Sequence, residues 1–330
     1  MTRWAAHGAP RPAGGSAANH GAPAGWRTLN AARRVGYRLL PGDAFSYVLH
    51  LRPREWPIMV GHMTLGFLLA QGVGATPRGA NVAPFLLALF VVVVLENGGT
   101  LAINSAFDRD VGDVGYLDAP PPVPRHLAAF SVALMSIGLA LSWMLPRAFF
   151  YTVAVCLAMS LLYSVPPVRL KAVAGADWLI NMVGFGTLTP YAGWAVTGRP
   201  LTAAAAWVLG GFCPLFAALY PLTQLYQMDE DRARGDRTLA LVVGVRASLV
   251  LSLAFATIAF ACFAAGARLA GAGASGWFSL GTAGAAWLAV LGRWLARHRA
   301  MAPAAHKRGM YLALGAWALT DAAVLVALIG

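Results

Sequence analysis

Long apolar runs alternate with short polar segments along most of the chain. A run of roughly 20 apolar residues is long enough to cross a bilayer as a helix, and this pattern predicts nine transmembrane helices. Pro146 and Arg147 separate the third run from the fourth. If the third and fourth runs formed a single span, every later span would cross the membrane in the opposite direction. The nine runs are Trp56–Ala75, Val82–Asn104, Leu127–Leu145, Ala148–Val165, Trp178–Val196, Ala203–Leu225, Ala247–Ala265, Gly276–Leu291 and Met310–Ile329.

The composition supports the same class. The chain of 330 residues is 58% hydrophobic and only 12% charged, and its mean hydropathy is +0.62. Soluble domains carry roughly 25% charged residues. We therefore expect an all-α, multi-pass membrane protein.

The distribution of basic residues predicts the orientation of the spans. If the N-terminus is cytoplasmic, only four of the 25 Lys and Arg residues fall on the opposite side: Arg78, Arg147, Arg199 and Arg268. The positive-inside rule expects such a bias, which suggests a location in the inner (cytoplasmic) membrane. Most of the net charge of +12 is explained by this topology, so nucleic-acid binding is not expected.

Residues 1–45 differ from the rest of the chain. They are rich in Gly, Ala and Pro and then become basic, a composition typical of disordered segments. The apolar run of a signal peptide is absent from them. We expect residues 1–45 to form a disordered basic tail and residues 46–330 to form one transmembrane domain.

The acidic residues are concentrated in two places. Eight of the 13 Asp and Glu residues form two clusters, one after the second span and one after the sixth, both on the predicted cytoplasmic side. Such clusters would repel each other across a cavity unless cations lay between them. The clusters are Asp108, Asp110, Asp113 and Asp118, and Asp229, Glu230, Asp231 and Asp236.

The spacing within the clusters favours a magnesium site. Asn104 and Asp108 lie one helical turn apart, and Gln227 and Asp231 repeat this spacing. Mg²⁺ is held by few protein oxygens and completes its coordination with water and phosphate, so an organic diphosphate is the expected ligand. The alternative is that the acids only balance cytoplasmic arginines, which is less plausible for two such clusters than for one.

Basic residues suited to phosphate lie in the same loops. The segment "YSVPPVRLK" supplies Arg169 and Lys171, and Arg125, Arg232 and Arg237 lie beside the acid clusters. An Arg side chain offers a bidentate fork to phosphate, and Lys offers a point charge.

Three motifs in this order resemble a known family. "NSAFDRDVGD", "LLYSVPPVRLK" and "YQMDEDRARGDRTLALVVG" are similar to the motifs of the UbiA superfamily of intramembrane prenyltransferases, and "LRPREW" is similar to its usual opening. The resemblance covers roughly residues 48–330. Gly112 stands where the family has the second Asp of its first motif, and Gln227 stands where it often has Asp.

The resemblance implies nine helices around a central cavity, capped by cytoplasmic loops. It also implies Mg²⁺-dependent transfer of an isoprenoid chain from a prenyl diphosphate to a lipophilic acceptor, aromatic or otherwise cyclic, with release of pyrophosphate. The catalytic residues would be Asp108, Asp231, Arg169 and Lys171. The metal ligands would be Asn104, Asp108, Asp110, Asp113, Asp229 and Asp231. The substrate-binding residues would be Asn104, Arg125, Tyr163, Gln224, Tyr226, Gln227, Arg237, Glu96 and Asn181.

Ionisable groups within the spans are costly and are candidates for function. Glu96 continues the stripe of Asn104 and Asp108, and it either faces the cavity, where it contacts the acceptor, or bonds a neighbouring helix. Asn181 has the same two interpretations. His62 and Asp321 lie in no motif, so we expect them to have structural partners.

Two other functions fit part of this pattern. A terpene cyclase would use the same diphosphate site without a separate acceptor. A transporter or membrane scaffold is less consistent, because transporters place their binding groups near the middle of the bilayer and here the acids gather at one face.

Overall fold

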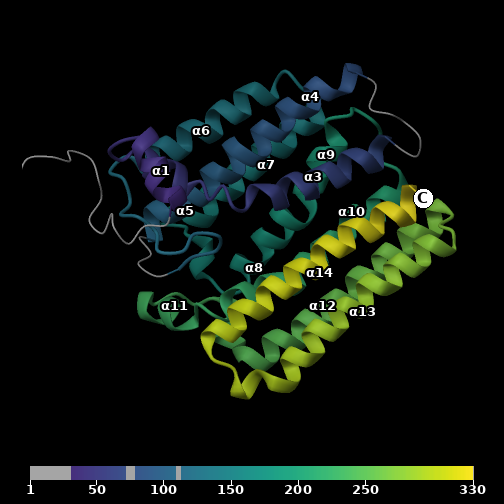
Figure 1. Cartoon of the computed structure of the whole chain (residues 1–330). Coiled ribbons are helices and arrows are strands. Elements are labelled where there is room, and N and C mark those ends of the chain that lie inside the picture. Colours follow the sequence, from purple (N-terminus) through teal and green to yellow (C-terminus); the bar gives the residue numbers. More distant parts are fainter. Residues whose placement is uncertain (1–30, 72–78, 109–112, 330) are drawn as a thin grey trace, which may run out of the picture.

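The computed structural model describes residues 31–71, 79–108 and 113–329, and within these ranges the chain is helical and has no β-strand (Figure 1). This confirms the all-α prediction. The helices are α1 (Ala31–Leu39), α2 (Ala44–His50), α3 (Trp56–Gln71), α4 (Gly79–Leu89), η2 (Phe90–Asn97), α5 (Gly98–Asp108), α6 (Leu127–Ser142), α7 (Arg147–Ser164), η3 (Leu170–Ala172), α8 (Ala176–Asn181), η4 (Met182–Leu188), α9 (Thr189–Ala195), α10 (Ala203–Gln224), α11 (Met228–Arg234), α12 (Leu239–Ala270), α13 (Ala274–Arg297), η5 (His298–Ala300) and α14 (Pro303–Ile329).

Each of the nine predicted spans overlaps a helical segment, and residues 72–75 of the first span lie outside the described residues. Within the described residues, six segments are long and apolar enough to cross a membrane: Val82–Asp108, Arg147–Ser164, Ala203–Gln224, Leu239–Ala270, Ala274–Ala300 and Pro303–Ile329. The helices α3 and α6 have 16 residues each, and α8, η4 and α9 together make a segment interrupted by a π turn. A multi-pass membrane protein is therefore confirmed, and the count of nine stays a prediction.

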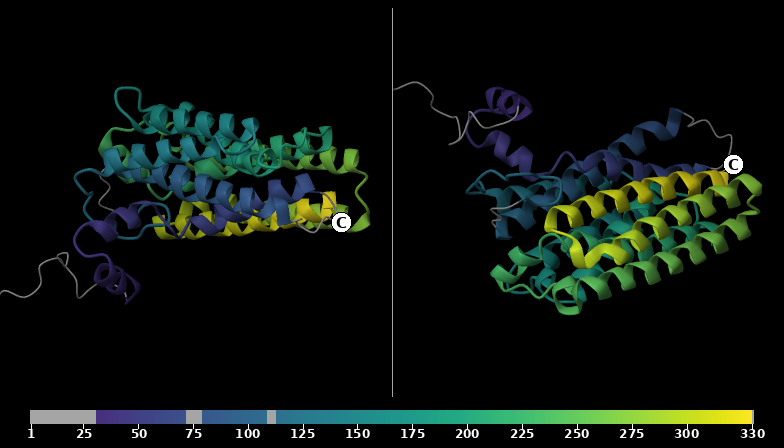
Figure 2. Two further views of the ribbon diagram at one scale, coloured as in Figure 1. Left: turned by 90° about the horizontal axis from the view of Figure 1, so that it is seen from above. Right: turned by 60° about the horizontal axis from the view of Figure 1, so that its bottom comes forward.

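The long helices run along one common direction. The C-terminal helices α12, α13 and α14 lie side by side, and α4 to α7 form the opposite part of the bundle (Figures 1 and 2). Phe212 of α10, Phe263 of α12 and Trp287 of α13 are fully buried where the C-terminal helices pack. Burial keeps these aromatic rings out of contact with lipid and water. Their contacts inside the bundle therefore determine how α10, α12 and α13 pack.

Two glycines let α3 cross α9 closely. A Cβ atom on Gly66 of α3 would lie 1.7 Å from the carbonyl oxygen of Pro190. A Cβ atom on Gly193 of α9 would lie 1.9 Å from the carbonyl oxygen of Met63. Small residues at the contact are the usual means by which membrane helices approach one another, and here neither glycine leaves room for a larger residue.

Part of the predicted disordered tail is helical. Residues 31–39 form α1 and α2 begins at Ala44, so the predicted disorder extends too far for this part of the tail. The reason is local contact: Tyr37 packs edge-on against Phe45, and its hydroxyl lies 2.9 Å from that of Ser46. The rest of the predicted tail lies outside the described residues.

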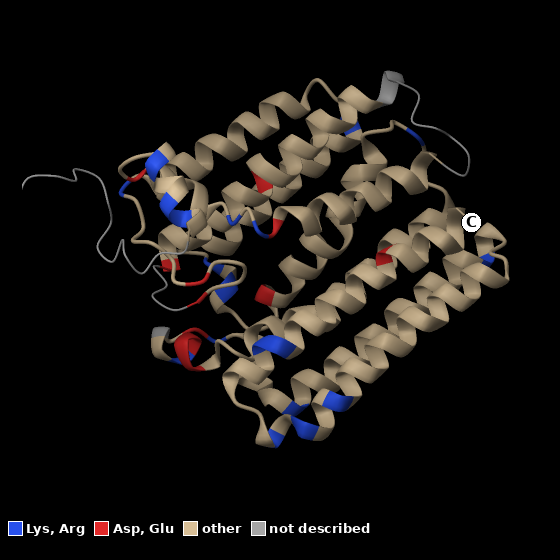
Figure 3. Cartoon of the chain, in the orientation of Figure 1, with Lys and Arg blue, Asp and Glu red and all other residues tan. Residues whose placement is uncertain are grey.

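Most charged residues gather at one end of the bundle (Figure 3). We call it the charged end; it comprises α1, α2, the segment 113–126, η3 and α11. The backbone amide of Arg237 donates to the carbonyl oxygen of Ala172 over 3.2 Å, which joins the segment after α11 to η3. The charged segments that lie far apart in the sequence are thereby brought together.

Candidate active site

A cavity of about 300 Å³ opens among the helices. At the charged end its lining is polar and includes Asn104, Asp108, Lys171 and Asp231. Further residues of the lining are large and apolar, among them Met59, Phe185, Phe216, Met310, Leu314 and Trp317. A ligand with a charged head and an apolar body matches this division.

The helix α5 carries the first polar group of the site. Asn104 and Asp108 lie one turn apart on the wall of the cavity, as their spacing predicted. The ammonium group of Lys171 donates to Asn104 Oδ1 over 2.7 Å and also to Asp108 Oδ2. The Asp108 side chain is 3% exposed, so its charge is balanced inside the protein rather than by water.

Arg169 connects this group to the second acid cluster. Its guanidinium donates to Asp108 Oδ1 over 3.1 Å and to Asp236 Oδ1 over 2.6 Å. Arg169 has a φ of 38°, a left-handed conformation uncommon for a side chain of this size.

Asp236 is a residue that the sequence prediction did not place in the site. It belongs to the second acid cluster and lines the cavity, and its side chain is 3% exposed. The sequence does indicate Asp236 as a candidate, because it is one of the four acids of the second cluster. Its role depends on the loop after α11 folding back to η3, which spacing alone does not reveal.

Asp231 is another residue of the second acid cluster that reaches the cavity. This residue is buried and lies on the cavity wall with Tyr226 and Gln227. The Gln227 side-chain amide donates to the carbonyl oxygen of Asp113 over 3.3 Å. The structure thus brings together Asn104, Asp108, Arg169, Lys171 and Asp231, all of which were predicted.

Gln224 lines the cavity, but its amide is used to hold the helices together. Its Nε2 donates to Asp177 Oδ2 over 2.6 Å, and its Oε1 accepts from the backbone amide of Ala240 over 3.0 Å. Asp177 Oδ2 also accepts from the backbone amide of Leu239 over 3.2 Å. These bonds join α8, α10 and the start of α12 beneath the charged end.

Tyr163 and Asn181 also lie on the cavity wall. The Tyr163 hydroxyl is 2.8 Å from that of Tyr220, and the Asn181 amide donates to the backbone carbonyl of Asp177 over 2.8 Å. Glu96 lines the cavity further along the stripe of Asn104. Its carboxyl oxygens have no hydrogen-bond partner among the described residues, so the bond to a neighbouring helix is not seen there, and a contact with the acceptor stays a prediction.

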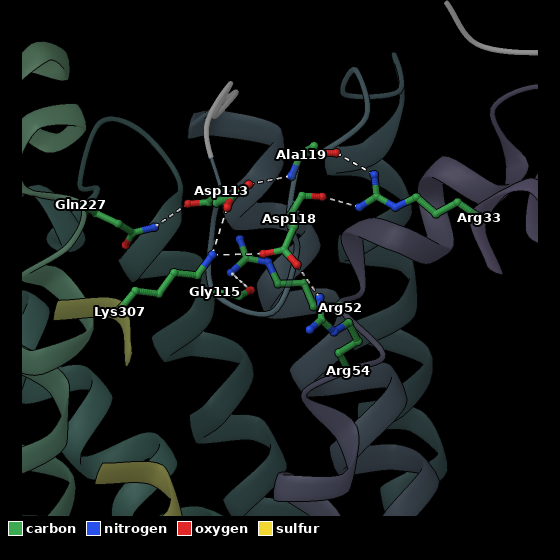
Figure 4. A network of polar contacts seen from close by, with 9 residues as sticks. All are labelled: Arg33, Arg52, Arg54, Asp113, Gly115, Asp118, Ala119, Gln227 and Lys307. Carbon is green, nitrogen blue, oxygen red and sulfur yellow. Dashed lines mark hydrogen bonds and ion pairs between the residues drawn. The ribbon is translucent and has the colours of Figure 1, made fainter. Parts of the chain in front are cut away.

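Several predicted site residues lie elsewhere. Asp113 Oδ1 accepts from the backbone amide of Ala119 over 2.9 Å, and its Oδ2 pairs with Lys307 over 3.0 Å (Figure 4). Asp229 is largely exposed and pairs with Arg232 over 2.8 Å. Arg125 and Arg237 are exposed. Asp110 and Gly112 lie outside the described residues.

The segment 113–119 is tied to both sides of the bundle. Asp118 accepts from Arg54 over 2.8 Å and from Lys307 over 3.1 Å, and its backbone carbonyl accepts from Arg33 (Figure 4). The hydrogen bond from Arg54 lowers the pKa of Asp118 below its ordinary value, and that from Lys307 adds to the effect. The neighbouring Gly115 and Tyr116 line the cavity, so these ion pairs secure one edge of its mouth.

A second polar group at the mouth comes from the opening motif "LRPREW". Arg52 lines the cavity and donates to the carbonyl of Gly115 and to Ser105 Oγ, each over 3.3 Å. Glu55 is buried beside it, and burial raises the pKa of its carboxyl to about 7. Burial also lowers the pKa of His50 to about 4. The prediction noted Arg52 as part of the motif but gave these residues no role.

The residues at the charged end have the chemistry of a magnesium site. Among the described residues, no group of three or more His, Cys, Asp or Glu side chains lies close enough to hold a metal unaided. The oxygen donors of Asn104, Asp108, Asp231 and Asp236 nevertheless line one cavity. Mg²⁺ commonly uses one or two carboxylates together with water and substrate phosphates, so this donor set fits the ion if a phosphate completes it.

His62 and Asp321 pair with each other inside the bundle. His62 Nδ1 lies 3.2 Å from Asp321 Oδ1, and the ring packs edge-on against Phe212 and Trp317. The expectation that both residues have structural partners is confirmed. The pair joins α3 to α14.

Comparison with known proteins gives consistent matches. The model of the UbiA prenyltransferase family matches residues 56–315. A digeranylgeranylglyceryl phosphate synthase of Natronomonas pharaonis is 29% identical over 192 residues, which are 57% of this chain and 68% of that protein. A lycopene elongase/hydratase of Haloarcula japonica is 25% identical over 218 residues, which are 60% of this chain and 67% of that protein.

The fold also matches solved structures. A UbiA homolog from Archaeoglobus fulgidus, bound to DMAPP and Mg²⁺, aligns with a TM-score of 0.59 and 17% identity. The alignment covers 83% of this chain and 99% of that one. At this identity the match establishes the fold, which agrees with the architecture described above.

Proposed function

The chain belongs to the UbiA prenyltransferase family, and we propose that it transfers an isoprenoid chain from a prenyl diphosphate to a lipophilic, aromatic or otherwise cyclic acceptor, with Mg²⁺ as cofactor and pyrophosphate as the leaving group. One observation carries the proposal. Arg169 and Lys171 converge on Asp108 at the mouth of an apolar cavity. The positive metal of a metal–diphosphate complex would meet the carboxylate there, and the negative diphosphate would meet the two basic side chains.

The basic residues would bind and orient the diphosphate. Arg169 lies between the carboxylates of Asp108 and Asp236, and Lys171 donates to Asp108, so phosphate oxygens can take a share of their hydrogen bonds. Positioned donors that meet developing negative charge are the largest single contribution to many enzymatic rates. Their contribution here is greatest when the bond between the allylic carbon and the diphosphate breaks.

The acidic residues would hold the metal. We propose Asn104, Asp108 and Asp231 as its first ligands, with Asp236 in place of the more distant Asp229 and Asp113. When bound, Mg²⁺ supplies a positive charge that neutralises the diphosphate and favours its departure. Asp110 stays a candidate ligand.

The walls of the cavity would protect the reactive carbon. Phe185, Phe216 and Trp317 present apolar surface where the isoprenoid chain would lie, and a dry cavity limits attack by water. Tyr163, Tyr226 and Asn181 would contact the part of the substrates nearest the diphosphate. Gln227 lines the cavity and Arg125 and Arg237 are exposed, and all three would act on entry of the charged group.

The location follows from the same proposal. We infer that residues 46–330 form one domain in the inner membrane, and that the charged end and the N-terminus face the cytoplasm. Prenyl diphosphates are water-soluble at the head and apolar along the chain, so they would enter from this side.

The test is pyrophosphate release by the purified protein in detergent. Farnesyl and geranylgeranyl diphosphate are supplied with a panel of acceptors, with and without Mg²⁺, to the wild type and to Asp108→Ala and Asp231→Ala. We expect release that requires Mg²⁺ and both aspartates. Equal release by wild type and variants, or none from any donor, would exclude the proposed chemistry. A product mass equal to a cyclised donor would instead identify a terpene cyclase.

A further inference from the structure

The second span contains a π-helical segment where it faces the cavity. Residues Phe90–Asn97 form η2, and α5 continues from it without a break to Asp108. Asn97 lies seven residues before Asn104, close to two full turns of a regular helix, so it shares that face, and Glu96 is its neighbour in the chain. Glu96 and Asn97 both line the cavity. Segments of this kind occur frequently at functional sites.

These two side chains are buried without hydrogen-bond partners. Glu96 is 4% exposed and Asn97 is 5% exposed. Within the described part of the chain, neither carboxylate oxygen of Glu96 and neither polar atom of the Asn97 amide has a partner. Native proteins pair nearly all buried polar groups, and an unpaired one requires an explanation.

Neighbouring polar groups are already engaged. The Thr100 hydroxyl lies 2.6 Å from that of Ser160 and donates to the backbone carbonyl of Glu96 over 2.8 Å. The Ser160 hydroxyl donates to the backbone carbonyl of Cys156 over 2.8 Å. The helix wall therefore satisfies its own hydroxyls and leaves the carboxyl and the amide to interact with something else.

The packing leaves space for the Glu96 carboxyl. A Cβ atom at Gly138 of α6 would lie 3.2 Å from Glu96 Oε1. The carboxyl therefore rests against a glycine, and a methyl group there would press on it. The side chain is held in place on that side by shape rather than by a hydrogen bond.

The pair lies too deep to contact the diphosphate. Asn97 precedes Asn104 by seven residues, which is about 10 Å along a helix. The described Lys and Arg residues that line the cavity are Arg52 and Lys171, and both lie at the charged end. An anionic group beside Glu96 would therefore have no compensating cation. An uncharged hydroxyl fits instead, because it donates to a carboxyl oxygen and accepts from an amide N–H.

We propose that Glu96 and Asn97 form a polar subsite that binds an uncharged hydroxyl group of the acceptor, remote from the atom that attacks the prenyl carbon. The inference rests on the proposed function and specifies the acceptor as a hydroxylated molecule. Binding energy from a remote group can position the reacting end. A subsite built to hydrogen-bond a hydroxyl also rejects the analogue that lacks it, because its own polar groups are then left unpaired.

The test uses a matched pair of probes. 2,6-Dihydroxynaphthalene has hydroxyls at both ends, and 6-methoxy-2-naphthol has the same rings with one hydroxyl methylated. Their dissociation constants are measured by calorimetry on the purified full-length protein. We expect the dihydroxy probe to bind about tenfold tighter to the wild type. In Glu96→Met and Asn97→Leu we expect the ratio to fall below about threefold.

Thermal stability separates a ligand subsite from a structural role. Because the polar atoms of Glu96 and Asn97 are unpaired, Glu96→Met and Asn97→Leu should raise the unfolding temperature of the ligand-free protein. Thr100→Val is the matched control, since it removes a bonded hydroxyl one turn away and should lower that temperature. Gly138→Ala keeps both residues, displaces the carboxyl and should reduce the selectivity between the probes.

The outcomes are distinct. An unchanged probe ratio in the variants, a fall in unfolding temperature in both, or failure of both probes to bind would overturn the subsite. Mg²⁺-dependent binding of farnesyl diphosphate is measured in the same preparations. If that binding is absent while the probe selectivity depends on Glu96 and Asn97, the proposed function fails and the hydroxyl subsite stands.

Discussion

Arg169 pairs with Asp236 over 2.6 Å, and the same guanidinium reaches Asp108 over 3.1 Å. One side chain thereby links the two acid clusters that the sequence places on separate loops. The arrangement makes the position of each carboxylate dependent on Arg169. Loss of this residue should change both halves of the proposed diphosphate site together.

Arg169→Lys keeps the positive charge but removes the fork that reaches two carboxylates. We expect Mg²⁺-dependent pyrophosphate release to fall by about 100-fold or more, the usual effect of removing one positioned donor. The measurement is the initial rate with farnesyl diphosphate. Arg268→Lys, at the opposite end of the bundle, is the control. A rate for Arg169→Lys within about threefold of wild type would contradict the role of the bridge.

Gln224→Leu should destabilise the protein. The substitution removes a donor from the buried carboxylate of Asp177 and an acceptor from the Ala240 amide. Unpaired buried groups cost about 1–3 kcal/mol each. The unfolding temperature in detergent is the measurement. Gln227→Leu removes an amide that makes a 3.3 Å hydrogen bond at the exposed edge, so it should shift the unfolding temperature much less, and equal shifts for the two variants would refute this argument.

Glu55 should make stability depend on pH. Burial raises the pKa of Glu55 to about 7 from an ordinary value of 4.5, so the folded state binds this proton more tightly than the unfolded state. Stability is therefore greatest below about pH 4.5 for this group and decreases as the pH rises to about 7, by at most roughly 3 kcal/mol. Glu55→Gln should be more stable than wild type at pH 8 and nearly equal at pH 4.5. Parallel pH profiles would show that Glu55 is not the cause.

Asp118→Asn should loosen the mouth of the cavity without unfolding the bundle. Asp118 pairs with Arg54 and Lys307, and all three side chains are partly exposed, so the global effect should stay within about 1 kcal/mol. The pKa of Asp118 is lowered, so its carboxyl is charged and paired at any pH above its ordinary pKa. The pairs are lost as the pH falls through the lower pKa of the folded state. Limited proteolysis should show faster cleavage within residues 113–122 in the variant at pH 7, and an unchanged cleavage rate would oppose this role.

Gly66→Ala should be severely destabilising, because its Cβ atom would lie 1.7 Å from a backbone oxygen of α9. Overpacking commonly costs about 1–3 kcal/mol, and more where backbone must move. Gly61→Ala on the same helix has no atom within 4 Å of its Cβ and serves as the matched control. Folded yield and unfolding temperature are compared, and similar values for the two variants would exclude a close crossing of α3 and α9.

The sequence predicts those features that depend on local spacing. Asn104 and Asp108 face one cavity because residues four apart share a helix face, and the helices follow from the apolar runs. Asp236 escapes such reasoning, because its position depends on how two distant loops meet at Ala172 and Arg237. Likewise His62 and Asp321 each require a partner, but only the packing of α3 against α14 shows that they are partners of each other.

The π turn in the second span shows the same limit. Asn97 lies seven residues before Asn104, so the period of a regular helix already predicts that the two share a face. The structure places Asn97 on the cavity wall at the end of a π-helical segment, and nothing in "VVVVLENGG" distinguishes this segment from an ordinary helix. Such a turn depends on what surrounds the helix, so only the folded structure reveals it.

The last helix of the chain completes the site. α14 supplies Met310, Leu314 and Trp317 to the wall of the cavity, and Lys307 in its second turn holds Asp113 and Asp118 at the mouth. Translation delivers this helix after all the others. A nascent chain that already carries both acid clusters therefore has neither a closed cavity nor a fastened mouth. Removal of α14 would therefore open the cavity and release its mouth, although both acid clusters would remain in the chain.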